Sequence, residues 1–170
     1  MLNIHKVDTD KCTMKIVGAV LSYLLKLAHI IDCQIEPKET LSKSKLYLII
    51  RELIEYGKGN VQCDGQLLVK QTCQVLAPIC SGPFVKRESI PISLLRNIIN
   101  IADARAALND GSRNLSSSEL ACLAGVTSQT VRLAITTGKL EAKLTLNDGS
   151  SSYYQISSDD CKRYLESLAS

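Results

Sequence analysis

The residues with the clearest chemistry in this sequence are Gln129 and Arg132, which stand three positions apart. Glutamine can donate to and accept from the edge of adenine, and arginine can donate two hydrogen bonds to guanine. In a helix, this spacing places both side chains on one side. The pair is therefore typical either of a helix that contacts DNA bases or of an ordinary solvent-exposed helix face, and the surrounding sequence must separate the two interpretations.

Cysteine and histidine are the next candidates for chemistry, as nucleophiles or metal ligands. The chain has seven cysteines and two histidines, and the closest cysteine pair, Cys73 and Cys80, is seven residues apart. Neither His5 nor His29 stands at metal-ligand spacing from such a pair, so the sequence predicts no metal site and no cofactor. The favoured interpretation is reduced thiols in the core of a cytoplasmic protein, with a redox or metal sensor left open.

Motifs for nucleotide binding or hydrolysis are absent from the sequence. Gly57-Lys58-Gly59 is too short for a phosphate-binding loop, and the serines at 116–118 are explained by helix capping. We therefore expect no enzyme. The first residues lack the pattern of a secretory leader, and charges interrupt the apolar run at 14–31, so no membrane segment is expected.

Two short capped helices are predicted to position Gln129 and Arg132. Ser116 and Glu119 match a capping box, and Gly125 ends the first helix. Thr127 caps a second helix, expected over about 127–137. Together they predict a helix-turn-helix. One face of the second helix is apolar, and the other carries Ser128, Gln129, Arg132, Leu133 and Thr136.

A hairpin and a last helix are predicted to follow. Apolar residues alternate over 140–146, with Leu140, Ala142, Leu144 and Leu146 expected to point inward. Residues 147–150 form a turn sequence, and Ser157 caps a helix that runs to about residue 168. Helix, turn, helix, hairpin and helix is the order of a winged helix-turn-helix.

The segments SELACLAGVTSQTVRLAITTGKLEAKL and YYQISSDDCKRYLESL resemble the excisionase and MerR-like winged helix-turn-helix superfamily, over about a third of the chain. The resemblance implies a recognition helix in the major groove and a wing on the neighbouring DNA backbone. By motif position it implies base or phosphate contacts for Ser128, Gln129, Thr130 and Arg132, and backbone contacts for Lys139 and Lys143. The expected DNA-binding residues also include Thr136, on the same helix face, and Arg113, on the side of the recognition helix and the wing.

The first 110 residues predict an all-helical domain, with apolar helices over about 14–31, 45–56, 66–79 and 91–108. The polar, turn-rich stretch 109–114 marks the boundary to the winged module at 111–170. The predicted fold class is thus mostly α, with a small β-hairpin near the carboxy terminus.

The charge of the predicted DNA-binding module indicates that one copy binds weakly. Residues 111–170 carry six basic and six acidic residues, although phosphate attraction supplies most non-specific affinity. The helices at 14–31 and 91–108 carry more apolar surface than a small bundle can cover, so we expect a homodimer through residues 1–110. The predicted function is a sequence-specific DNA-binding regulator or recombination accessory factor. The alternative is a protein–protein interaction module or antitoxin-type regulator that binds a protein partner.

Overall fold

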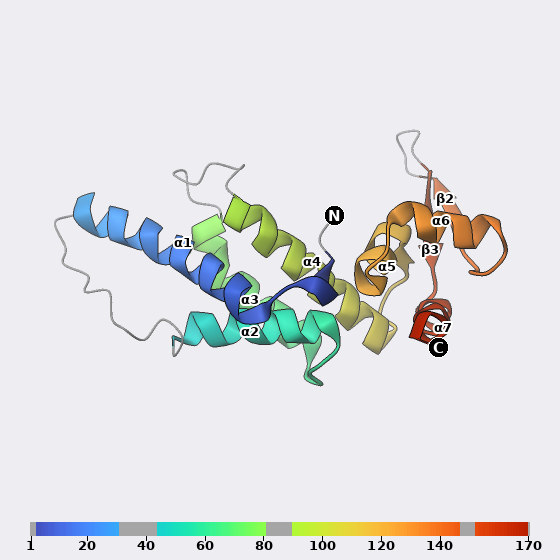
Figure 1. The fold of residues 1–170 in the computed structure, drawn as a ribbon, viewed down its shortest axis with the longest axis horizontal. Coiled ribbons are helices and arrows are strands. Elements are labelled where there is room, and N and C mark those ends of the chain that lie inside the picture. The colour runs from blue at the N-terminus through green and yellow to red at the C-terminus, as the bar shows by residue number, and fades with distance from the viewer. Residues whose placement is uncertain (1–2, 31–43, 81–89, 147–151, 170) are drawn as a thin grey trace.

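The computed structural model describes residues 3–30, 44–80, 90–146 and 152–169. Within these ranges the chain is mostly helical, with a small three-stranded antiparallel sheet. This agrees with the predicted mostly α fold class. A short 3₁₀ turn, η1 (Ile4–Lys6), precedes four long helices that occupy one half of the molecule (Figure 1). These are α1 (Thr9–Ile30), α2 (Lys45–Lys58), α3 (Gly65–Cys80) and α4 (Ile90–Asp110).

Helix α4 is the central element, because it contacts α1, α2 and α3 as well as α5 and α7 of the other half. Many of its apolar residues are buried, on more than one side of the helix. Those that are buried include Leu95, Ile98, Ile101, Ala102, Ala104, Ala106, Ala107 and Leu108. Other elements of the same chain therefore cover these residues, and the homodimer expected from the apolar surface of this segment stays a prediction.

The other half of the molecule holds the shorter elements (Figure 1). In chain order they are β1 (Leu115–Ser116), α5 (Ser117–Ala124), α6 (Ser128–Thr136), β2 (Lys143–Leu146), β3 (Ser152–Ile156) and α7 (Ser158–Ala169). The strands are antiparallel in the order β1-β3-β2. Leu115 pairs with Ile156, and Leu144 pairs with Tyr154.

The predicted caps of α5 and α6 are confirmed. The Ser116 hydroxyl accepts from the Glu119 N–H at 3.2 Å, and the Glu119 carboxylate accepts from the Ser116 N–H at 2.8 Å. Gly125 ends α5 with a φ of 68°, a left-handed conformation that suits glycine. The Thr127 hydroxyl accepts from the Thr130 N–H at 3.1 Å. Local hydrogen bonds thus set both ends of the turn that joins α5 to α6.

The hairpin differs from the prediction in one respect. Leu144 was expected to point inward, but it is 56% exposed, whereas Leu140 is buried. Cross-strand pairing puts Leu144 and Tyr154 on the same sheet face as the buried Ile156. The alternation therefore predicts the right face, but Leu144 lies two residues further along the hairpin than the core extends.

Strand β1 was not predicted, because two residues carry no detectable periodicity. The turn expected at 147–150 and the side chain of Leu146 lie outside the described residues. The same holds for the amino-acid side chains of the last part of α1, so the apolar face expected there at Leu24 and Leu27 is not described.

One hydrophobic core connects the two halves. It extends from Ile4 and Ile16 through α2 and α4 to Leu120 and Cys161. Gly111, with a φ of 64°, turns the chain directly after α4, within the predicted boundary at 109–114. Division into domains 1–110 and 111–170 stays a prediction. Over the described ranges, no helix is long and apolar enough to cross a membrane.

Candidate nucleic-acid interface

Helix α6 has one buried and one exposed face. Val131 is fully buried and Ala134 is nearly so, and the helix packs against α5. The residues on the other side are exposed, namely Gln129, Thr130, Arg132, Leu133 and Thr136. Lys139, just after the helix, and Lys143, the first residue of β2, are also exposed. The structure thus places seven of the eight predicted DNA-contacting residues on α6, just after it or at the start of β2.

Four of these side chains are free of protein partners in the part of the chain that the structure describes. They are Gln129, Arg132, Lys139 and Lys143, for which neither a hydrogen bond nor an ion pair is recorded. The hydroxyl groups are differently placed. The Thr130 hydroxyl lies 2.8 Å from that of Thr127. The Thr136 hydroxyl donates to the Leu133 carbonyl at 3.0 Å. The Ser128 hydroxyl donates to the Ser118 hydroxyl of α5 at 3.4 Å. Free amide and cationic groups are therefore available to a ligand, whereas the hydroxyls serve the helix.

The charges of this half of the chain are separated along the sequence. From Thr127 to Lys143 there are three basic residues and one acidic residue, Glu141. Helix α7 instead carries three acidic residues, Asp159, Asp160 and Glu166, against two basic ones, Lys162 and Arg163. The α6 side thus has a local excess of positive charge, although residues 111–170 are neutral as a whole. This excess would attract a polyanion.

No family model, no curated protein and no solved structure matches this chain. The resemblance to the excisionase and MerR-like superfamily therefore stays a prediction from the sequence motifs.

Arg113, the eighth predicted residue, lies in a different environment. Its guanidinium forms ion pairs with Asp103 of α4 at 2.7 Å and with Glu119 of α5 at 2.8 Å. A DNA phosphate would have to compete with both carboxylates for this side chain. The geometry gives Arg113 a role that the sequence did not suggest, as an ionic connection between α4 and α5, and its contact with DNA stays a prediction.

The turn between α5 and α6 has partners that sequence reasoning missed. The Asn3 amide donates to the Gly125 carbonyl at 2.9 Å, and His5 Nε2 donates to the Leu123 carbonyl at 2.7 Å. Ile4, between them, is fully buried in the core. No local signal could have revealed these contacts, because about 120 residues separate the partners in the sequence. They fix the amino-terminal segment against the candidate interface.

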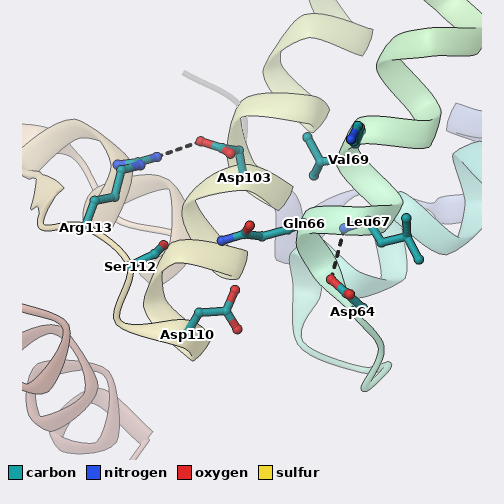
Figure 2. A pocket seen from close by; sticks show the side chains of 9 residues that line it. Asp64, Gln66, Leu67, Val69, Asp103, Asp110, Ser112 and Arg113 are labelled. Carbon is teal, nitrogen blue, oxygen red and sulfur yellow. Dashed lines mark hydrogen bonds and ion pairs between the residues drawn. The ribbon is translucent and has the colours of Figure 1, made fainter.

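A hollow lies between α3, α4 and the segment that follows α4 (Figure 2). It measures about 980 Å³, and its charged lining residues are Asp64, Lys70, Asp103, Asp110 and Arg113. Two of its carboxylates already have structural roles. Asp64 accepts from the Leu67 N–H at 3.0 Å in the first turn of α3, and Asp103 holds Arg113 (Figure 2). The α6 surface is the stronger candidate, because its functional groups have no such roles.

The cysteines only partly follow the predicted core placement. Cys12 and Cys161 are buried, and burial raises the pKa of the Cys161 thiol to about 12, so that thiol is protonated at neutral pH. Cys63 and Cys73 are exposed, which corrects the core interpretation for these two. The side chains of Cys33 and Cys80 lie outside the described residues, so a Cys73–Cys80 pairing is not tested. Among the described side chains, no group of three or more potential ligands could hold a metal ion.

Proposed function

We propose that this protein binds double-stranded DNA in a sequence-specific manner, with α5 to α7 acting as a winged helix-turn-helix. The observation that carries the proposal is the outer face of α6, where Gln129 and Arg132 are exposed and free while Val131 anchors the opposite face in the core. The nine residues of α6 span about 14 Å. A helix of this size fits a B-DNA major groove, which is about 12 Å wide.

The free groups fit distinct tasks in such a complex. Gln129 is the better candidate for base recognition, because its amide can both donate to and accept from adenine. Arg132 has a mixed role, since a guanidinium can bind either guanine or phosphate. Lys139 and Lys143 follow α6 and start β2, and as flexible point charges they suit backbone phosphates.

A homodimer is part of this proposal. A module with equal numbers of acidic and basic residues gains little phosphate attraction, and two copies on paired half-sites would supply the missing affinity. The carboxy-terminal half of α1 extends beyond the other three long helices (Figure 1). The last eight residues of this helix have the sequence YLLKLAHI, which is rich in apolar residues, so a second copy of the chain is a suitable partner for them. A transcriptional regulator and a recombination accessory factor both fit this arrangement.

The experiment is selection of duplexes from a random pool, followed by binding of the selected and a scrambled duplex at several salt concentrations. Gln129→Ala should cost about 1–3 kcal/mol on the selected duplex and relax its sequence preference. Lys143→Ala should weaken binding to both duplexes alike and reduce the salt slope by about one. Lys162→Ala in α7 is the charge-matched control, since Lys162 is exposed on a helix outside the proposed interface, and it should bind like the wild type.

A second candidate function is supported by Leu133 and Leu144, which are 62% and 56% exposed. Exposed leucines on α6 and β2 would suit a protein partner, as in an interaction module or antitoxin-type regulator. The two functions are separated by the binding series above. If wild-type protein and the variants Gln129→Ala, Arg132→Ala and Lys143→Ala all bind both duplexes equally, sequence-specific DNA binding is wrong and the protein-binding function replaces it.

A further inference from the structure

Leu133 occupies an unusual position for an apolar side chain. At 62% exposure it is the most exposed large hydrophobic residue in the described part of the chain. It lies on α6, one turn after Gln129 and nearly one turn before Thr136. With roughly 100° per residue, these three side chains project within about 60° of one another. On the same scale, the exposed side chains of Arg132 and Thr130 mark the two edges of the outer face, and Leu133 projects between them.

The fold keeps Leu133 in this position. Val131 is fully buried on the opposite side of α6, so a rotation that covered Leu133 would expose Val131. The hydroxyls of Thr136 and Thr137 both donate to the Leu133 carbonyl, at 3.0 and 2.8 Å. These threonine side chains fold back onto the last turn of the helix, and the Leu133 side chain is left as the apolar group that projects from it.

We infer that Leu133 is a specificity-determining residue that contacts the 5-methyl group of thymine in the major groove. The inference rests on the proposed DNA binding and deepens it. Thymine carries the apolar methyl group of the major-groove edge, while the other base edges present hydrogen-bond donors and acceptors that leucine cannot satisfy. Gln129, one turn earlier on the same face, suits adenine. Together the two residues select a site that contains A·T pairs.

The surroundings of Leu133 favour DNA over an apolar protein partner. Its neighbours on the outer face are polar or basic, namely Gln129, Arg132 and Thr136. The local charge excess from Thr127 to Lys143 is positive. A single apolar side chain within a polar, cationic surface complements a groove that is anionic overall and offers isolated methyl groups. An apolar protein surface would instead leave the neighbouring cation and amide without partners.

The test replaces thymine by uracil, which lacks only the 5-methyl group. A duplex selected by the wild-type protein is synthesised with uracil at one thymine position at a time, and its dissociation constant is compared with that of the parent. At one or two positions the wild type should bind the uracil duplex about fourfold more weakly, the value expected for one buried methyl group. Leu133→Ala should bind the thymine and uracil duplexes equally at those positions.

Leu144→Ala is the matched control. Leu144 is also an exposed leucine, at 56%, but it lies on β2 rather than α6, so this variant should keep the preference for thymine. Circular dichroism should show equal helical content for both variants, because neither side chain is in the core.

Three outcomes separate the inference from the function on which it rests. Equal binding of thymine and uracil duplexes by the wild type at every position overturns the role of Leu133 and leaves DNA binding intact. A thymine preference that persists in Leu133→Ala assigns the methyl contact to another residue and overturns it as well. If the wild type selects no duplex from the random pool, the proposed function itself is wrong and the inference falls with it.

Discussion

Glu119 combines a helix cap with an ion pair. Its carboxylate accepts hydrogen bonds from the Ser116 N–H and hydroxyl, both at 2.8 Å, and it pairs with Arg113 at the same distance. Burial alone would raise the pKa of Glu119, but the hydrogen bonds from Arg113 and Ser116 outweigh it and the pKa lies below its ordinary value. The ionised form of Glu119 thus stabilises the fold. Its contribution to stability is complete above the pKa of the unfolded chain, about 4.3, and is lost once the pH falls below the pKa in the folded protein.

This charge can be tested with Glu119→Gln, because glutamine can still make the bond of a capping box. At pH 7 the variant should be less stable by about 0.5–1 kcal/mol, a small value because the partners are partly exposed. The difference from the wild type should shrink as the pH falls through the folded pKa of Glu119. Urea unfolding at pH 7 and at pH 3 measures it. Glu141 is exposed, so the control variant Glu141→Gln should leave the stability unchanged at both pH values. An equal loss of stability at pH 7 and pH 3 for Glu119→Gln would contradict the role of the charge.

Gly65 and Gly18 form a matched pair of glycine positions with opposite predictions. A Cβ at Gly65 would overlap the hydroxyl oxygen of Tyr56, a buried side chain that also accepts a hydrogen bond from Asn109. Gly65→Ala should therefore destabilise the protein by about 1–3 kcal/mol through overpacking. A Cβ at Gly18, inside α1, would meet nothing within 4 Å, so Gly18→Ala should stabilise it by about 0.5–1 kcal/mol. Thermal unfolding of the two variants checks both signs, and a shift in the same direction would refute the packing argument.

At the scale of elements, the position of α6 depends on contacts from outside its own half of the molecule. The 3₁₀ turn η1 contacts α2, and its flanking Asn3 and its own His5 donate to carbonyls at the end of α5. The Arg113 ion pairs join the same helix α5 to α4. The surface proposed to bind DNA is therefore held by the long-helix half through its amino-terminal segment and through α4.

We predict that the double substitution Asn3→Ala and His5→Ala loosens the turn between α5 and α6. The backbone N–H groups of Gly125 and Val126 bond to carbonyls of α5, at 3.4 Å from Cys122 and 3.1 Å from Ala121. Without the two external bonds, hydrogen exchange at these amides should accelerate about fivefold to tenfold. Lys6→Ala is the control, because Lys6 is exposed, and its exchange rates should match those of the wild type. Unchanged exchange in the double variant would show that the turn does not depend on η1.

At the scale of the whole molecule, the continuous core bears on how the chain unfolds. Buried residues of η1, α1, α2 and α4 belong to the same cluster as those of α5, β3 and α7. Removing either half would expose apolar surface of the other, which costs about 25 cal/mol for each Å². A chain with one core is expected to unfold cooperatively, even where the sequence suggests a domain boundary.

The expected result is a single unfolding transition for the full chain. Urea unfolding followed by far-ultraviolet circular dichroism and by amide exchange of β3 should give coincident curves. The fragment 112–170 should be less stable than the same segment within the full chain, because it lacks α4 and η1. Two separate transitions would instead support independent domains at 1–110 and 111–170.

Sequence alone determined the features that depend on neighbours a few residues away. The capping box of Ser116 and Glu119, the Thr127 cap and the Gly125 end of α5 are closed by hydrogen bonds within one helical turn. The apolar face of α6 follows from the same short period, and so does the set of residues on its outer face. These predictions are accurate because all their partners lie within the same short segment.

Only the tertiary structure decided which side chains remain available. Arg113 has the residue type of a phosphate ligand, but α4 brings Asp103 to it and α5 brings Glu119. Leu144 has the right alternation for a core position, but the core ends before it. Asn3 and His5 show no local pattern and gain their role from a turn about 120 residues away. The physical reason is common to all of them: hydrogen bonds, ion pairs and burial depend on which segment lies opposite, and that is set by packing between elements distant in the sequence.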